Sequence, residues 1–185
     1  MLFATNGRFY TLQADKLPGG RGFGEPVRLM IDLPNESAIV ALFVHKPGRR
    51  LLVAASDGRG FFVAEDDVLA QTRAGKQVLN LAAGAEAALC VEASGDSVAV
   101  IGSNRKMAMF PAADVPALGR GRGVILQRYR GGTLADARVF TRKEGLSWTT
   151  GAGTRTETAL AELFCERGAK GREPPKGFPR SNRFG

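Results

Sequence analysis

Short apolar and β-branched runs, paired around polar turns, recur four times along the chain. The turns are Asn6-Gly7, Asp57-Gly58, Gly102-Ser103-Asn104 and Gly151-Ala152-Gly153. Around the second turn, for example, residues 51–55 and 59–63 are mostly apolar. Asn-Gly and Asp-Gly tolerate the positive φ angles that a tight hairpin turn requires. The pattern therefore predicts four β-hairpins.

A loop rich in glycine and basic residues follows each turn after about 15 residues. The four loops are Gly19-Gly20-Arg21-Gly22, Arg73-Ala74-Gly75-Lys76, Arg120-Gly121-Arg122-Gly123 and Arg167-Gly168-Ala169-Lys170. Arg73, Arg120 and Arg167 are spaced by 47 residues, twice in succession. Further short apolar segments follow at residues 38–44, 87–91 and 135–140. Each unit is therefore predicted to contain a hairpin, a basic loop and one or two more strands.

Repetition at this spacing is typical of propeller-like arrays, in which each repeat forms one blade. We predict an all-β fold with about four four-stranded blades in a single domain, residues 1–185, with repeats at about 1–44, 45–93, 94–140 and 141–178. No segment has a sustained helical period, and residues 66–69 and 114–118 look like single helical turns. The Pro/Gly/Arg-rich segment 171–185 is predicted to be a tail that is ordered only if it docks or binds.

The net charge of +8 is polarised along the chain. Residues 1–119 hold 12 basic and 12 acidic residues, whereas residues 120–185 hold 14 basic and 6 acidic residues. A polarised basic surface is typical of a protein with a polyanionic partner, because each neutralised phosphate releases condensed counterions. Small residues beside Arg and Lys also let backbone N–H groups approach a phosphate. Basic loops at one offset in a blade array predict a rim of cations that matches the phosphates of a bent duplex.

Signals for catalysis and metal binding are weak. His45 is the only histidine and lies beside the turn signal Lys46-Pro47-Gly48, so we interpret it as a surface residue. The acids Glu65-Asp66-Asp67 suit the start of a helical turn. Gly75-Lys76 is followed by Gln77 rather than Ser or Thr, which excludes a P-loop. We therefore predict no catalytic centre, no metal site and no cofactor on this chain.

The cysteine count and the apolar runs indicate a cytoplasmic protein. Cys90 and Cys165 are too few for a disulfide framework, and their apolar neighbours predict buried thiols in a reducing compartment. No apolar run reaches the roughly 18 residues of a membrane span. The first residues lack the basic and then apolar layout of a signal peptide.

An ordered series of segments points to a known family. The series is Asn6-Gly7-Arg8, Lys16-Leu17-Pro18-Gly19-Gly20-Arg21-Gly22-Phe23-Gly24-Glu25-Pro26, Ala54-Ala55-Ser56-Asp57-Gly58-Arg59-Gly60-Phe61, Arg73-Ala74-Gly75-Lys76, Met109-Phe110-Pro111-Ala112-Ala113-Asp114-Val115-Pro116, Gly121-Arg122-Gly123-Val124-Ile125 and Glu166-Arg167-Gly168-Ala169-Lys170-Gly171-Arg172. It resembles the C-terminal domain of the bacterial topoisomerase IV A protein, in the type IIA topoisomerase family, over nearly the whole chain. The resemblance implies a β-pinwheel, a propeller-like disc whose blades exchange strands and whose basic rim binds and bends duplex DNA.

The resemblance also implies a parent enzyme that passes one duplex through another, with ATP and Mg²⁺ bound on other domains. The expected partners are duplex DNA, the ATPase B subunit and the rest of the topoisomerase A protein, in the nucleoid. The domain is expected to steer substrate choice for decatenation and relaxation in chromosome segregation. Tyr10 and Tyr129 lie in repeat strands and are not expected to cleave DNA.

Two departures from the family pattern refine this expectation. The related gyrase A domain carries a Gln-Arg-Arg-Gly-Gly-Lys-Gly box in its first blade. Here Gln127-Arg128-Tyr129-Arg130-Gly131-Gly132 resembles the box only loosely and lies in the third repeat, so topoisomerase IV is preferred to gyrase. Relatives have five or more blades, so one N-terminal blade is expected to be missing from this chain.

The predicted DNA contacts are the basic residues of the four loops and the tail. They are Arg21, Arg73, Lys76, Arg120, Arg122, Arg167, Lys170, Arg172, Lys176, Arg180 and Arg183. Their expected role is to neutralise and position phosphates of a bent duplex without reading its sequence. Two alternatives stay open from the sequence: a propeller that binds an acidic protein, and a gyrase A wrapping domain.

Overall fold

The computed structural model describes residues 1–185 as four small antiparallel sheets joined by short 3-10 turns. The first sheet has the order β3 (Ile39–Leu42), β1 (Leu2–Ala4), β2 (Arg8–Tyr10), β6 (Lys76–Gln77), and the second β10 (Val124–Ile125), β5 (Arg59–Ala64), β4 (Arg50–Ala55), β7 (Ala87–Glu92). The third has the order β11 (Leu134–Phe140), β8 (Ser97–Gly102), β9 (Met107–Pro111), and the fourth pairs β12 (Leu146–Thr150) with β13 (Gly153–Glu157). The 3-10 turns are η1 (Ala14–Lys16), η2 (Val27–Leu29), η3 (Glu65–Val68), η4 (Ala112–Asp114) and η5 (Ala161–Leu163). The fold contains no helix with the length and apolarity that a membrane crossing needs.

The first three hairpins turn on the same pair of side chains. An Asn or Asp Oδ1 atom accepts the backbone N–H two residues later, at 3.1 Å in each case, in Asn6, Asp57 and Asn104. The hydroxyl just before it accepts an N–H at the start of the last strand of the same blade, and these pairs are Thr5 with Ala38, Ser56 with Glu86 and Ser103 with Thr133. Such local bonds stabilise turns and fix the path of the returning strand. The four predicted hairpins are confirmed.

The blades exchange strands. β6 belongs to the second repeat but pairs with β2 of the first, and β10 belongs to the third repeat but pairs with β5 of the second. The same exchange continues in the fourth repeat as a single bridge, where Arg172 and Met107 donate to each other's carbonyl oxygens. Each repeat is therefore completed by the one that follows it in sequence.

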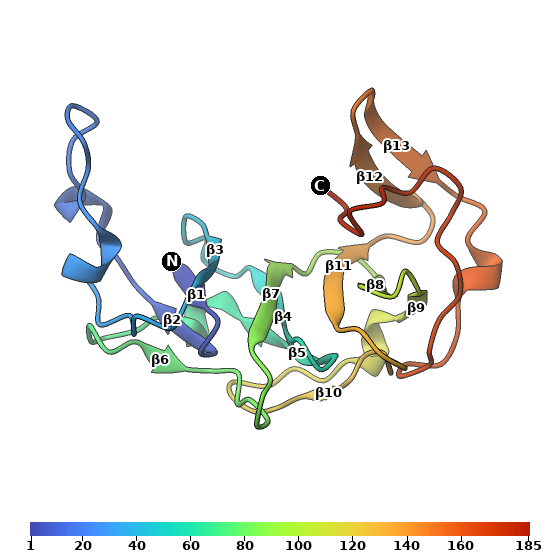
Figure 1. Ribbon diagram of the computed structural model, residues 1–185, viewed down its shortest axis with the longest axis horizontal. Helices are drawn as coiled ribbons and strands as arrows, with labels where there is room; N and C mark the ends of the chain where they lie inside the picture. Colours follow the sequence, from blue (N-terminus) through green and yellow to red (C-terminus); the bar gives the residue numbers. More distant parts are fainter.

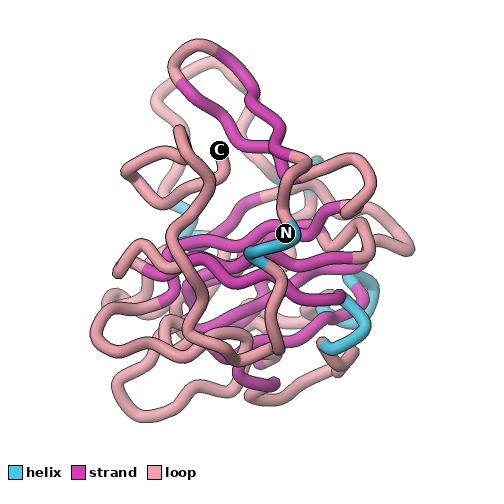
Figure 2. Tube along the Cα trace, turned by 90° about the vertical axis from the view of Figure 1, so that its right-hand side faces the viewer, coloured by secondary structure: helices cyan, strands magenta, loops and turns pink.

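The blades form an arc that is open at the top of Figure 1, with β3, β7 and β11 on its inner side. One apolar core fills each space between neighbouring blades. Phe3, Phe9 and Phe61 lie in the first of these cores, Phe62 and Phe110 in the second. In the side view, helical turns are confined to short segments around the strands (Figure 2). The all-β, propeller-like prediction is confirmed.

The later blades have fewer strands than predicted. The third sheet has three strands and the fourth has two, whereas four per blade were expected. Part of the missing cover comes from the segment predicted to be a tail, because Thr149 N–H donates to Phe184 O at 2.7 Å. Phe178 and Phe184 are buried against Trp148, with ring centroids 5.5 Å apart for Trp148–Phe178 and 5.1 Å for Phe178–Phe184. The segment 171–185 therefore docks on the third and fourth blades.

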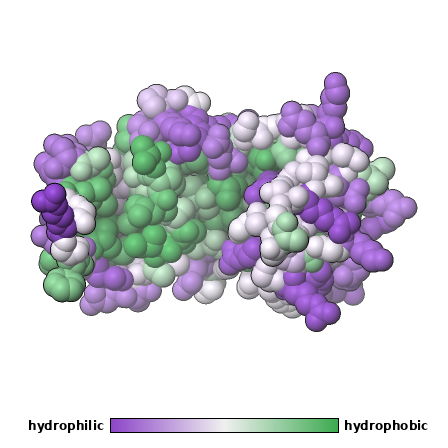
Figure 3. All heavy atoms as spheres, turned by 90° about the horizontal axis from the view of Figure 1, so that it is seen from above, coloured by the Kyte–Doolittle hydropathy of each residue, from purple (hydrophilic) through white to green (hydrophobic).

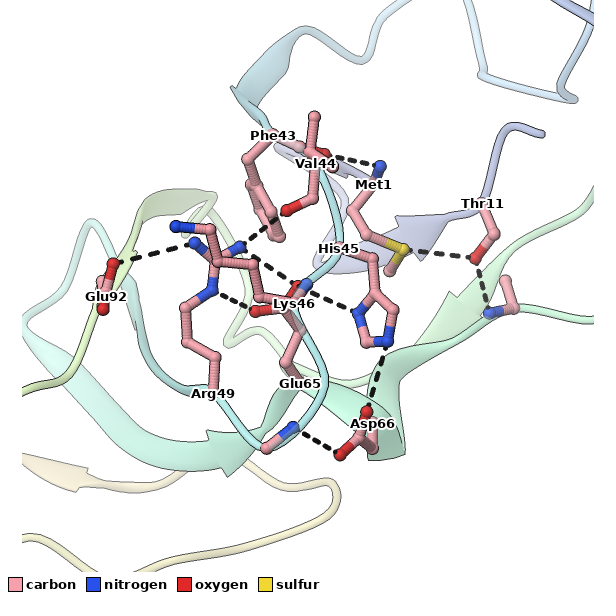
Figure 4. Close-up of polar contacts among 12 residues, drawn as sticks. Met1, Thr11, Phe43, Val44, His45, Lys46, Arg49, Glu65, Asp66 and Glu92 are labelled. Carbon is pink, nitrogen blue, oxygen red and sulfur yellow. Dashed lines mark hydrogen bonds and ion pairs between the residues drawn. The ribbon is translucent and has the colours of Figure 1, made fainter. Parts of the chain in front are cut away.

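A polar cluster joins the first blade to the second (Figure 4). The fully buried Glu65 carboxylate forms an ion pair with Arg49, accepts the Lys46 N–H at 2.9 Å and lies 3.0 Å from His45 Nδ1. Burial alone would raise the pKa of Glu65, but these hydrogen bonds outweigh it and lower the pKa. His45 is therefore not a simple surface residue, and Glu65 does more than open a helical turn: together they tie the link between β3 and β4 to η3.

Candidate nucleic-acid interface

The exchanged strands bring three of the four basic loops to one edge of the arc. β6, β10 and the segment around Arg172 follow the lower edge in Figure 1, each lying against the hairpin of the preceding blade. A glycine closes each loop just before its exchanged strand: Gly75, Gly123 and Gly171, with φ of 74°, 72° and 80°. A side chain there would meet the neighbouring backbone, because an added Cβ would lie 2.2 to 2.7 Å from a carbonyl oxygen of that hairpin. We call this edge the rim.

Basic residues of the hairpin turns hold the rim loops in place. Arg8 Nη1 donates to the carbonyl oxygens of Ala74 at 3.1 Å and Gly75 at 3.3 Å. Arg59 Nη1 donates to Gly123 O at 3.5 Å. The equivalent residue of the third turn, Lys106, pairs instead with Glu173. These roles were not predicted from the sequence, although a basic residue two positions after each Asn or Asp was a visible signal.

The second loop places two exposed cations on the rim, and both have partners within the chain. Arg73 Nη2 donates to Leu29 O at 2.9 Å, and Arg73 Nε lies 3.3 Å from Asp32 Oδ1. Lys76 Nζ donates to Asp67 O at 2.5 Å. Solvent competes with contacts between exposed groups such as these, so both cations remain available to an anion.

The third loop has the cations with the fewest internal contacts. Arg120 Nε makes one hydrogen bond, to Asn80 Oδ1 at 3.3 Å, and the side chain of Arg122 makes none. Both side chains are exposed. The positions before and after Gly123 and Gly171 correspond, so Arg122 matches Lys170 of the fourth loop.

In the fourth loop, one predicted contact residue is committed to the fold. Arg167 is half-buried, and its Nη1 donates to Ile125 O at 2.7 Å, so the expectation of a freely exposed side chain is wrong for this residue. Lys170 and Arg172 line a surface hollow together with Arg128, whose Nη1 donates to Gly168 O at 3.1 Å. Lys170 is exposed, and Arg172 lies at the start of the docked tail. Arg128 is a rim residue that was not among the predicted contacts.

The other predicted cations lie away from the rim. Arg21 is exposed in the loop between η1 and η2, which projects at the upper left of Figure 1. Lys176, Arg180 and Arg183 are exposed on the docked tail, which climbs from the rim across the fourth blade. The structure thus gathers six solvent-facing residues, which we call the rim cations: Arg73, Lys76, Arg120, Arg122, Lys170 and Arg172.

The 47-residue spacing of Arg73, Arg120 and Arg167 does not make these arginines equivalent. The closing glycines Gly75 and Gly123 are 48 residues apart, as are Gly123 and Gly171. The arginines therefore move one residue further from the closing glycine in each successive loop. The extra residue explains how Arg167 reaches back to the third blade while Lys170 stays on the surface.

The two tyrosines are not presented as nucleophiles. Tyr10 is fully buried, and its hydroxyl accepts the Asn6 side-chain N–H at 2.9 Å. Burial raises the pKa of Tyr129 well above its ordinary value. No group of three or more His, Cys, Asp or Glu side chains is arranged to hold a metal ion.

Comparison with known proteins gives one consistent result. The DNA topoisomerase 4 A protein of Caulobacter vibrioides is 45% identical over 186 residues, and that of Rickettsia bellii is 40% identical over 184 residues; all of this chain is matched but only 24% and 25% of those proteins. The chain therefore spans about a quarter of the length of these curated relatives. The solved E. coli ParC C-terminal domain superposes with a TM-score of 0.80 at 26% identity, over 97% of this chain and 77% of that chain. A solved DNA gyrase A C-terminal domain gives a TM-score of 0.66 at 16% identity, over 92% of this chain and 58% of that chain.

These likenesses agree with the strand exchange, the repeated turns and the arc of blades. The family model described as the DNA gyrase C-terminal domain, beta-propeller, matches residues 1–46, 49–88 and 96–140, which is most of the chain. The resemblance inferred from the sequence is confirmed: the chain belongs to the DNA gyrase C-terminal domain family, and its relatives of 40% and 45% identity are topoisomerase IV A proteins.

Proposed function

We propose that this chain binds duplex DNA along the rim and bends it, without strong sequence preference. The observation that carries the proposal is the rim itself: strand exchange sets three glycine-containing basic loops along one edge, with six solvent-facing cations. Phosphates recur along a duplex, and a curved row of cations neutralises more of them when the duplex bends to follow it. Contacts to phosphates alone fix position but do not read bases.

The proposal extends to a parent protein. The relatives of 40% and 45% identity are A proteins of DNA topoisomerase 4, which supports a place in the corresponding protein of a type IIA topoisomerase. There the domain would bind the DNA to be transported and steer decatenation and relaxation during chromosome segregation, in the cytoplasm at the nucleoid. ATP, Mg²⁺ and the cleavage chemistry would belong to the B subunit or to the rest of the A protein, and none of them to this chain.

A gel-shift assay with a random-sequence duplex and a scrambled duplex tests the proposal. Equal affinity for the two duplexes is expected, because the rim cations have no bases to read. A strong preference for one sequence would contradict backbone recognition. Binding to an acidic protein but not to DNA would favour an interaction propeller instead. Supercoil introduction into relaxed circles by the holoenzyme would favour gyrase-type wrapping.

A further inference from the structure

The first repeat contains an exchange segment with no hairpin to receive it. Its hairpin turn and that of the second repeat are 51 residues apart, at Asn6 and Asp57. Gly24 and Gly75 are also 51 residues apart, and their φ angles are 72° and 74°. Gly24 therefore corresponds to the closing glycines of the rim loops, and Glu25 and Pro26 correspond to β6.

The surroundings of Gly24 differ from those of its equivalents in one respect. A Cβ added at Gly75 or Gly123 would lie 2.7 Å from Phe9 O or 2.2 Å from Gly60 O, whereas at Gly24 nothing lies within 4 Å. Gly24 keeps the positive φ that the exchange needs, but no backbone lies beside it. A close approach of another chain segment would explain why glycine occupies this position.

The residues after Gly24 suit the register of an exchanged strand. Arg172, the residue after Gly171, exchanges two hydrogen bonds with Met107, so the next position along an antiparallel pair faces its N–H away from the partner. Pro26 occupies that next position in the first repeat and would cost no ladder hydrogen bond. Val27 would then donate as Val78 and Leu126 do, to the carbonyl oxygens of the turn residues Gly7 and Gly58.

The face of the first blade that would meet such a hairpin is apolar. Phe3 and Phe9 face the second blade, while Leu2 and Tyr10 belong to a separate buried cluster on the other side, covered by Ile31 and Leu33 of the chain that follows η2. Apolar surface gathers over this half of the arc when it is viewed from above (Figure 3). Its exposed large apolar side chains include Leu29, Ile39, Leu42 and Val44.

We propose that residues 24–27 are a preformed strand donor for one further β-hairpin of this repeat type, carried by polypeptide outside residues 1–185. The solved ParC domain supports this occupant, because the chain covers only 77% of that domain. The proposal does not depend on DNA binding. Its basis is that the three other closing glycines all abut a hairpin, whereas Gly24 has the same conformation and none.

Hydrogen exchange without DNA tests the donor segment, comparing the 185-residue chain with a complete topoisomerase A protein that contains it. The Glu25 and Val27 amides should exchange at least tenfold more slowly in the complete protein, while those of Lys76 and Val78 should be unchanged. Gly24→Val should abolish the slowing, because a β-branched side chain opposes both the positive φ and the close approach. Equal rates at Glu25 and Val27 in the two proteins, or slowing that survives Gly24→Val, would overturn the proposal. Slowing in the short chain at high concentration would also overturn it, since a second copy would then be the occupant.

Discussion

At the scale of single residues, the exchange of strands depends on glycines that other residues cannot replace, for two separate reasons. One is the left-handed backbone conformation, which an L side chain adopts at a cost of about 1 kcal/mol. The other is contact, because Gly123 lies against Gly60 of the preceding hairpin. Gly24 has the first constraint and not the second within this chain, so the pair separates the two effects.

Gly123→Ala should destabilise the chain by about 3 kcal/mol, since the added methyl group overlaps a backbone carbonyl and adds overpacking to the strain in φ. Gly24→Ala should cost only about 1 kcal/mol, because its methyl group meets open space. Urea unfolding of both variants provides the measurement, with Gly24→Ala as the matched control. Equal losses would show that backbone conformation alone requires the glycines.

The buried Glu65 is the second residue on which the fold depends. Glu65→Gln would leave Arg49 without its anionic partner, and breaking a buried ion pair in this way costs about 3 kcal/mol. Because the folded-state pKa of Glu65 is lowered, its contribution is complete above the ordinary carboxyl pKa of about 4.3 and declines as the pH falls through the lowered value. The difference in unfolding free energy between the wild type and Glu65→Gln should therefore be large at pH 7 and smaller at pH 3. A difference that does not change with pH would mean that Glu65 acts through packing alone.

At the scale of elements, the sequence predicts what is local and misses what is exchanged. Asn6-Gly7 and Asp57-Gly58 identify their hairpins because one residue pair specifies the turn. The pairing of β6 with β2 joins residues far apart in the sequence, and no pattern in either strand names its partner. The half-burial of Arg167 was not predictable for the same reason, since its acceptor Ile125 lies on the exchanged strand of another repeat.

The tail shows a further limit of local patterns. Its composition resembles that of a disordered segment, yet Arg105 holds it through bonds to the carbonyl oxygens of Phe178 and Pro179 and to the side chain of Asn182. Arg105 occupies the left-handed turn position filled by Gly7 and Gly58 in the other hairpins, with φ of 62°. A non-glycine residue there is the sequence signal for the docking, and its meaning depends on contacts across more than 70 residues.

Arg105→Gly should therefore release the tail and keep the turn. The change restores the glycine found in the other hairpins and removes three hydrogen bonds to the tail, so the Phe178 and Phe184 amides should exchange at least tenfold faster. The β8–β9 amides should be unaffected. Faster exchange in β8 and β9 as well would indicate that the turn itself needs the arginine.

At the scale of the whole molecule, the rim is uneven. Net charge is zero over residues 1–119 and +8 over residues 120–185, and the second loop lies near Asp32, Asp66 and Asp67. Nearby acids lower the potential that a phosphate meets, and within about 10 Å salt at 0.1 M does not screen them fully. The third and fourth loops should therefore dominate DNA binding.

Charge reversal of Arg120 with Arg122 should weaken duplex binding more than charge reversal of Arg73 with Lys76. Each pair supplies two exposed cations in a rim loop, so the two variants control for one another. Fluorescence anisotropy with a labelled duplex gives the affinities, after circular dichroism and a melting curve have shown that both variants are folded. Equal losses, or a larger loss at Arg73 and Lys76, would mean that the geometry of the blades rather than regional charge sets the strength of contact.

The salt dependence of duplex binding by the 185-residue chain tests the central claim most directly. Each phosphate neutralised on a duplex contributes about −0.9 to the slope of log affinity against log salt, so six rim cations predict a slope of about −5. The slope should fall in magnitude by about 2 when Arg120 and Arg122 are both replaced by Ala. A slope near zero for the unaltered chain would contradict the account of the rim as a DNA-binding surface.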